Sequence, residues 1–438
     1  MPGFVPLDRR RFLRLAGLTG AAAGLDGALA GCRPAAVRAG RRQVRIGWVS
    51  SRSGRWAGYG QADDHVLQQA RRTVLADGLP LGGRSYQVRL LVRDSHSDPS
   101  LARTATRELI DREQVDMVLA SSTVETTVPV ADECEATGIP CVTTGTPYQT
   151  WFLARRGVDP GTAPRPFRWT WHMFWGLEDV IAVFADMWGQ LVSDQVVGVL
   201  WPDDLEGRAW GDGETGFPAF LRPQGYRLVD PGAYRAGSER WTGRVDAFRA
   251  ARAEIVAGVP APVEFAAFWR RARQRGYRPR IASVARALTF PVFLEAMGDA
   301  EGLSAEVSWS PAHPWRSSLD GRSSAQLADG YTAATGRQWV QPLGLAHALL
   351  EVAVDALRRA GGPEDKFALA AAVRGTDIDT VAGHVAWVAG QADLPNVART
   401  PLVGGQWRGG RRWPLELVVV SNEAHPEIPA GGTLEPLS

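Results

Sequence analysis

The sequence predicts an α/β protein with two parallel sheets in separate domains, and three observations lead to that prediction. Short apolar runs alternate with stretches of helical periodicity along most of the chain, the pattern of parallel sheets covered by helices. At 438 residues the chain is long for a single core. A strongly aromatic stretch, Phe167 to Trp175, separates one such α/β series from the next.

The first 32 residues are interpreted as an export signal and excluded from the fold. Arg9 and Arg10 open a charged block that precedes a weakly hydrophobic, Gly- and Ala-rich stretch, and this arrangement resembles a twin-arginine signal. The segment ends in Leu29-Ala30-Gly31-Cys32, which resembles a bacterial lipobox and implies that the Cys32 thiol receives a lipid. The alternative is a disordered basic tail. Residues 33–43 then form a tether.

The first α/β series begins at Val44. Residues 44–49 form an apolar run, and apolar positions in 62–74 recur at helical spacing. A second strand is predicted over 86–92. Asp98-Pro99 then predicts a helix start, with Asp98 as N-cap and proline in the first turn.

The most informative stretch is the βαβ unit of residues 114–148. A strand over 115–119 and a strand over 139–142 flank a helix over 125–137, and small polar residues follow each strand. In such units ligands bind outside the carboxyl ends of the strands, where hydroxyls meet helix N-terminal amides. The alternative is that these serines and threonines only cap helices and form turns.

A second α/β series follows residue 176. Helices are predicted around 177–188, 248 and 265–269, and strands over 196–200, 255–259 and 281–284. Residues 302–309 lead into further helices at 325–335 and 343–360, and 402–420 forms a hairpin.

Several functional classes are disfavoured by composition and motifs. A net charge of +2, without a basic run beyond the N-terminus, argues against nucleic-acid binding. The sequence contains no serine-hydrolase elbow, Walker loop or His-Glu-x-x-His, and its histidines lack metal-ligand spacing, so no catalytic residue, cofactor or metal is predicted. His172, among tryptophans, is predicted to pack. Cys134 and Cys141 form either a disulfide or two packed thiols.

The order of motifs in the first series resembles type I periplasmic binding proteins. Gly82-Gly83-Arg84 precedes a strand, residues 93–99 follow it, a helix carries Leu109-Ile110, and Gly138-Ile139-Pro140 comes later. The branched-chain amino acid, amide and urea receptors of ABC importers are the most similar group. The resemblance implies two doubly wound lobes joined by crossover strands that close around a solute. Lobe 1 would comprise 44–166 and 309–400, and lobe 2 would comprise 167–308 and 401–438.

The resemblance also implies a set of ligand-binding residues. From the first lobe they are Tyr59, Ser121, Ser122, Thr123, Thr144, Gly145 and Thr146. Thr126 or Thr127 is an alternative to Ser122 or Thr123. Trp210, beside Gly211, stands where the family places an aromatic residue against the ligand. Trp171, Trp175 and Trp201 are further candidates, with packing in a lobe core as the alternative.

Arg286 occupies the turn where the family's amino-acid receptors place a carboxylate for the ligand's ammonium group. No acidic residue lies within seven positions on either side of this arginine. The sequence therefore predicts a solute that presents a carboxylate or another acceptor to the guanidinium, and not an α-amino acid in the usual pose. The alternatives are that Arg286 points to solvent or pairs with Asp203 or Asp204.

Together these features predict a non-enzymatic, lipid-anchored protein of the cell envelope, periplasmic or on the outer face of the cytoplasmic membrane. It would capture a small polar solute (an amino-acid-like, amide or carboxylate compound) and deliver it to an ABC permease. A ligand-sensing subunit of a signalling system is an alternative with the same fold. An envelope amidase or hydrolase would need a nucleophile–base pair that the sequence does not show.

Overall fold

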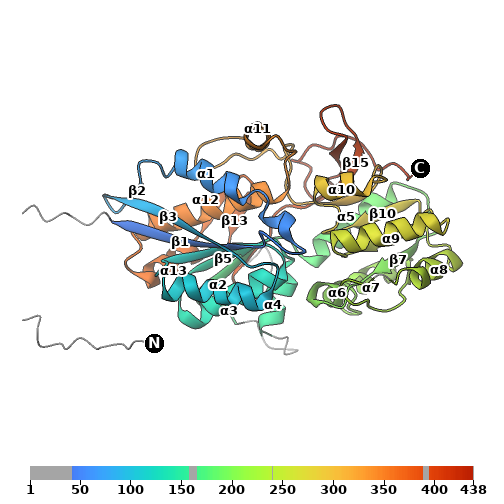
Figure 1. Cartoon of the computed structure of the whole chain (residues 1–438), viewed down its shortest axis with the longest axis horizontal. Coiled ribbons are helices and arrows are strands. Elements are labelled where there is room, and N and C mark those ends of the chain that lie inside the picture. The colour runs from blue at the N-terminus through green and yellow to red at the C-terminus, as the bar shows by residue number, and fades with distance from the viewer. Residues whose placement is uncertain (1–41, 157–164, 239, 388–393, 438) are drawn as a thin grey trace, which may run out of the picture. The chain divides into compact units, whose positions relative to one another are not determined.

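Two seven-stranded sheets organise the chain, each with helices on both faces (Figure 1). The computed structural model describes residues 42–156, 165–238, 240–387 and 394–437, and the chain from Arg41 onward forms one unit. The predicted export signal, Cys32 and most of the tether lie outside the described residues. Among the described residues, no helix combines the length and apolar character needed to cross a membrane.

The first sheet has the strand order β14-β6-β5-β4-β1-β3-β2. All neighbouring pairs are parallel except β2 with β3. The strands β4, β5 and β6 are buried along their whole length because helices cover both faces. Their bounds are β1 Gln43–Ser50, β2 Leu79–Leu81, β3 Arg84–Asp94, β4 Met117–Ser121, β5 Cys141–Thr144, β6 Thr170–Met173 and β14 Val397–Ala398.

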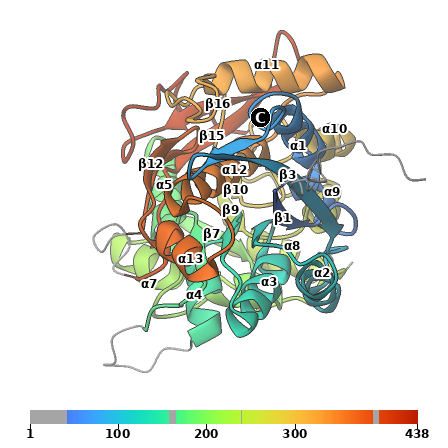
Figure 2. The same cartoon turned by 90° about the vertical axis from the view of Figure 1, so that its left-hand side faces the viewer.

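The helices of the first lobe divide between the two faces of this sheet. Figures 1 and 2 show α2, α3 and α4 together on one face and α1 and α12 on the other. The bounds are η1 Ala57–Gly60, α1 Asp63–Arg72, α2 Pro99–Asp111, α3 Val124–Thr137, α4 Tyr148–Arg156, α11 Ser324–Thr335, α12 Pro342–Ala360 and α13 Lys366–Arg374. The predicted N-cap is confirmed, since the Asp98 carboxylate accepts from the amides of Ser100 and Leu101.

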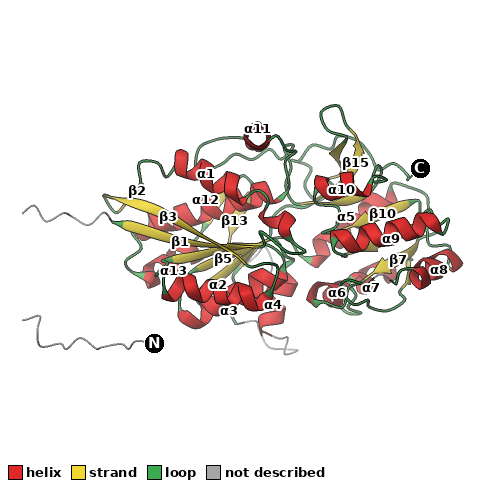
Figure 3. Cartoon of the chain, in the orientation of Figure 1, coloured by secondary structure: helices red, strands yellow, loops and turns green. Residues whose placement is uncertain are grey.

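The second sheet has the order β16-β15-β11-β10-β9-β7-β8, and helices and strands again alternate along it (Figure 3). The pair β15–β16 is the predicted hairpin and joins the sheet antiparallel to β11. The strands are β7 Val196–Leu200, β8 Arg227–Val229, β9 Ile255–Gly258, β10 Ile281–Val284, β11 Ser304–Val307, β15 Val403–Gly409 and β16 Leu415–Ser421. The helices are α5 Leu177–Gly189, α6 Leu205–Trp210, α7 Phe217–Leu221, η2 Arg222–Gln224, α8 Thr242–Ala250, α9 Pro262–Gln274 and α10 Pro291–Met297; β12 Asp377–Thr380 and β13 Gly383–Ala386 form a separate ribbon.

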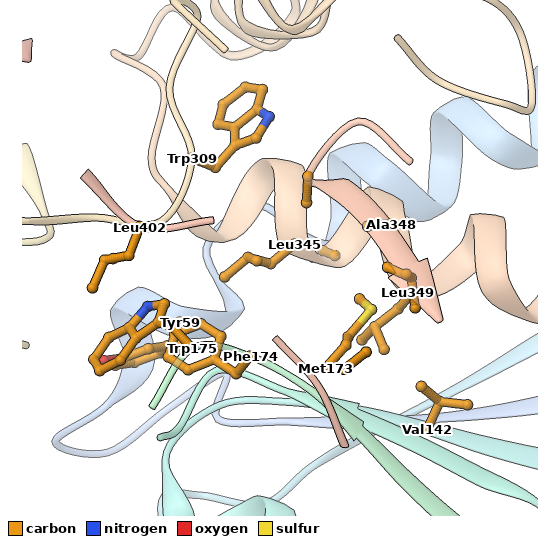
Figure 4. Packing of buried hydrophobic residues seen from close by; sticks show 14 of the residues in the cluster. Tyr59, Val142, Met173, Phe174, Trp175, Trp309, Leu345, Ala348, Leu349 and Leu402 are labelled. Carbon is orange, nitrogen blue, oxygen red and sulfur yellow. The ribbon is translucent and has the colours of Figure 1, made fainter. Parts of the chain in front are cut away.

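The central helix α12 anchors the core of the first lobe. Figure 4 shows Leu345 and Leu349 of this helix directed towards the strands that carry Val142 and Met173. All four side chains are at most 2% exposed. Burying a leucine of this kind contributes about 1.5–3 kcal/mol, so α12 is a major source of the lobe's stability.

The chain passes from the first lobe to the second later than predicted. The predicted boundary between the lobes lies at residues 166–167. Strand β6 pairs with β5 and β14 in the first sheet, so Thr170–Met173 belongs to the first lobe. Helix α5 is the first element that packs on the second sheet, against β11, β15 and β16. The aromatic stretch that was predicted to open the second lobe therefore closes the first.

Candidate functional site

A small buried cavity lies between loops of the first lobe and helix α6 with the turn after β10 of the second. It encloses about 20 Å³, room for about one water molecule, so a solute of amino-acid size enters only if the walls separate. The lining residues are Tyr59, Gly145, Pro147, Phe174, Trp175, Glu206, Trp210, Ala285, Arg286, Thr289, Glu306, Ser308, Gln341, Pro342 and Leu345.

Aromatic side chains from both lobes form much of the cavity wall. Tyr59 contacts Phe290 edge to face at 5.1 Å between ring centroids, and Phe174 packs on Trp175 at 4.6 Å. Figure 4 shows Tyr59, Phe174 and Trp175 gathered below Leu345. From the second lobe, Trp210 also lines the cavity. These rings give the site large flat surfaces of low polarity.

Arg286 is the centre of an ion-pair network at the cavity. Its guanidinium lies 2.8 Å from Glu206 and 3.2 Å from Asp204, and it stacks over Trp56 at 4.4 Å. It also donates to the Val259 carbonyl at 2.5 Å. Burial alone would lower the pKa of Arg286, but the two carboxylates outweigh burial and raise it.

The prediction of an uncompensated guanidinium at Arg286 is therefore wrong, and the alternative pairing with Asp204 is what the structure contains. Acidic residues distant in the sequence reach this arginine because α6 and the turn after β10 meet at the same edge of the sheet. The backbone of Arg286 has φ +57°, a conformation that non-glycine residues seldom adopt. Such backbone strain is common at functional sites.

Two buried glutamates lie against the cavity. Glu206 accepts a hydrogen bond from Thr146 at 2.6 Å, and burial raises its pKa to about 7 although Arg286 opposes the shift. Glu306, on β11, accepts from the Arg286 amide through Oε1, while its Oε2 is buried without a hydrogen-bond partner. Burial raises the pKa of Glu306 to about 8.

The predicted serines and threonines of the first lobe fall into two groups. Ser122 donates to Ser51 at 2.8 Å, and Thr126 bonds to Ser51 at 3.0 Å, so these hydroxyls satisfy each other inside the lobe. By contrast, the hydroxyls of Ser121 and Thr123 are buried without a hydrogen-bond partner.

The second polar patch reaches the cavity directly. Gly145 lines it with φ +103°, and a Cβ there would stand 2.6 Å from the Ser122 carbonyl oxygen, so only glycine fits. Thr146 contacts the cavity residue Glu206. Thr144 is turned away and donates to the Met173 carbonyl.

The structure brings four of the predicted site residues together on the cavity wall: Tyr59, Gly145, Trp210 and Arg286. The further candidate Trp175 also lines it, whereas Trp201 packs against Trp210 and Phe217. The placement of Trp171 at the site is wrong. Its strand, β6, belongs to the first sheet, and Trp171 is fully buried in that lobe's core.

Sequence reasoning missed the two glutamates, although each left a signal. Glu306 interrupts the buried strand Ser304–Val307, and an acid inside an apolar strand needs a functional or structural reason. Glu206 follows the acidic turn after β7. Thr289 and Gln341 were also missed, because isolated polar residues beside helix starts resemble ordinary caps.

His172 and the two cysteines have structural roles. His172 packs as predicted, stacking on Trp151 at 4.9 Å. It also bonds to the Thr146 carbonyl, and burial lowers its pKa to about 3. Cys134 and Cys141 are separate buried thiols. Within the described residues, no group of three or more His, Cys, Asp or Glu side chains is placed to hold a metal ion.

Two α/β lobes with a polar and aromatic cavity between them have the architecture of a type I periplasmic binding protein. The periplasmic binding protein family matches residues 43–408. Because this match covers most of the chain, the protein belongs to that family. No curated protein sequence matches the chain.

Solved structures of binding proteins share the fold. A leucine binding protein from Thermotoga maritima is 17% identical, with a TM-score of 0.70 over 87% of this chain and 99% of that chain. A branched-chain amino acid transporter substrate binding protein from Streptococcus pneumoniae, in complex with isoleucine, is 15% identical (TM-score 0.67; 86% and 100% covered). A solute binding protein of an ABC transporter from Rhodopseudomonas palustris, in complex with 3,4-dihydroxybenzoic acid, is 14% identical (TM-score 0.67; 86% and 96% covered).

Proposed function

We propose that the protein is an extracytoplasmic solute-binding lipoprotein that captures a small polar solute between its lobes and delivers it to an ABC importer. One observation carries this proposal: unsatisfied polar atoms gather at the cavity. The Thr289 hydroxyl, Glu306 Oε2 and the indole N–H groups of Trp175 and Trp210 are buried there without hydrogen-bond partners. Each such group costs about 1–3 kcal/mol, and a solute with matching donors and acceptors offsets that cost.

The contacts between the lobes support opening and closing around the solute. Beside the cavity they include the Thr146–Glu206 hydrogen bond, the stacking of Arg286 on Trp56, and a weak ion pair of 3.7 Å between Arg55 and Glu264. The buried hydrogen bond to Glu206 contributes about 1.5–3 kcal/mol and the buried stacking about 2 kcal/mol. The ion pair adds at most about 1 kcal/mol, since the Arg55 side chain is 32% exposed. A hinge motion breaks few of them at a time, and such motion is the usual way for two lobes to admit a ligand.

Amino-acid-like compounds and amides remain the proposed solutes, whereas the ion pairs of Arg286 give no support to a carboxylate bound there. Delivery to an importer is supported by family membership and by relatives of the same fold described as transporter components. Anchoring to the envelope through lipid at Cys32 rests on the sequence of the export signal. Binding without reaction is supported by the lining of the cavity: three of its residues carry hydroxyls, Tyr59, Thr289 and Ser308, and no histidine is among the lining residues to act as their base.

A thermal-shift screen tests the proposal. The purified protein is heated with amino acids, amides, amines and small carboxylates, and a bound solute stabilises the folded state by about 2.7 kcal/mol at a hundredfold excess over Kd. We expect members of this polar panel to raise the melting temperature. A response to long acyl chains alone, or to no member of the panel, contradicts the proposed function.

A further inference from the structure

The charges at the cavity are unbalanced towards the negative side. Among the described residues that line the cavity, Arg286 carries the only positive charge. Its single charge is shared between Glu206 at 2.8 Å and Asp204 at 3.2 Å. Glu306 is a third acid at the site, and Glu206 and Glu306, which both line the wall, are 1% and 5% exposed. Glu125, at the start of α3, adds a negative charge that contributes, after burial, to the raised pKa of Glu206.

One guanidinium does not balance three acids, so the buried carboxyls of Glu206 and Glu306 are unfavourable in their charged forms. Burial removes hydration, and Arg286, the one cation among the cavity-lining residues, offsets that loss only in part, so the pKa values of Glu206 and Glu306 rise to about 7 and about 8. A cation in the cavity would reverse this penalty. It would also supply a donor to Glu306 Oε2, which lacks one. An anion in the same place would face both carboxyls, with Arg286 already engaged.

The rest of the wall suits the same class of ligand. The aromatic rings of Tyr59, Phe174, Trp175 and Trp210 line the cavity beside the two acids. Cations are attracted to the faces of such rings. The stacking of Arg286 on Trp56 shows that cation–π contact is already used at this site. Leu345 and the rings also offer apolar surface for hydrocarbon.

We propose that the solute carries a net positive charge on a nitrogen that Glu306 receives, with its hydrocarbon or aromatic part packed against the aromatic wall. The class is that of small organic amines or amidines. This inference rests on the proposed function, since it specifies the solute that the cavity takes.

Matched probes that differ only in charge test the inference. Isothermal titration calorimetry at pH 8 compares 2-phenylethylamine, 2-phenylethanol and 3-phenylpropionate, and then isopentylamine, isopentanol and isovalerate. We expect the amine of each set to bind at least about tenfold more tightly than its neutral and anionic partners. Glu306→Gln keeps the shape of the side chain and removes its charge, so it should weaken amine binding by about 10- to 100-fold, as for a lost charged hydrogen bond, and leave the alcohols unaffected.

Glu351→Gln is the matched control. Glu351, in α12, is another fully buried glutamate, and burial raises its pKa to about 7. It accepts hydrogen bonds from Ser318 and Val381 and does not line the cavity. It should retain wild-type affinity for the amines.

Calorimetry of amine binding to the wild type in different buffers is a second test, and it does not require a variant to fold. It reports the net exchange of protons by Glu306 and by the groups that face it, which are Glu206, Arg286 and Tyr59. If a cation binds there at pH 7, the glutamates release protons, and the measured enthalpy changes with the ionisation enthalpy of the buffer. Three results would overturn the inference and leave the proposed function standing. They are tighter binding of a neutral or anionic probe, unchanged amine binding in Glu306→Gln, and uptake of protons on binding. Failure of all six probes and of the whole thermal-shift panel overturns both.

Discussion

Removal of the Arg286 guanidinium should destabilise the folded protein by about 3–5 kcal/mol at neutral pH, because it breaks a buried ion pair from one side. The side chain is 4% exposed and lies 2.8 Å from Glu206 and 3.2 Å from Asp204. Arg286→Ala leaves both carboxylates without their cation, and the Val259 carbonyl loses its donors. The stacking on Trp56 is lost as well.

Urea unfolding followed by tryptophan fluorescence measures the effect, and Arg273→Ala is the matched control. Arg273 also stacks on a tryptophan, Trp269, and pairs with an acid, Asp299 at 2.6 Å. Because Asp299 is 59% exposed, water solvates its charge when the arginine is removed, and the cost should be at most about 1 kcal/mol.

The loss in free energy of unfolding caused by Arg286→Ala should become smaller as the pH falls from 7 to 5. Without the arginine, the folded-state pKa of Glu206 rises further, and that of Asp204, which burial raises but Arg286 now holds below its ordinary value, rises as well. The folded variant therefore takes up protons that the unfolded chain does not bind at pH 7. That uptake becomes easier as the pH falls. The ion-pair network of Arg286 would be refuted if the two arginine variants lost the same free energy of unfolding, or if the loss in Arg286→Ala did not change with pH.

Three further predictions follow from the sequence and structure. The melting temperature of the ligand-free protein should fall as the pH rises from 6.5 to 8, since Glu206 and Glu306 titrate in the folded state near 7 and 8, well above their ordinary value of about 4.5; a flat or rising melting temperature in scanning calorimetry would contradict this. Gly145→Ala should cost at least about 1–3 kcal/mol in urea unfolding because φ is +103° and the new methyl meets the Ser122 carbonyl, and a neutral effect would show that the loop adapts. Cys32→Ala should move the protein from the membrane fraction to the soluble fraction, and unchanged membrane association would rule out the lipid anchor.

Local signals in the sequence were sufficient for most strands and helices. Apolar runs of strand length, such as 196–200 and 281–284, became buried strands with the same bounds. The Asp98 N-cap depends only on its neighbours in the chain, so the sequence predicted it.

The candidate site was only partly predictable because its chemistry depends on contacts between distant segments. The sequence offered Asp204 only as an alternative partner of Arg286 and gave no sign of Glu206, because both acids are brought to the arginine by the packing of α6. Trp171 and Trp175 are close neighbours in one aromatic stretch, yet the first is in the core and the second lines the cavity. That difference arises because β6 ends at Met173, between them.

Native mass spectrometry tests the central claim, that one small solute binds between the two lobes. Wild-type protein exposed to pooled small metabolites should retain a single solute at one copy per chain. Tyr59→Ala and Trp210→Ala each remove part of the cavity wall, one from each lobe, and both should lose the solute. Trp241→Ala removes an equally buried tryptophan that lies in the second-lobe core, away from the cavity, and should retain it. No bound solute in the wild type, or a solute retained by both wall variants, would contradict the account.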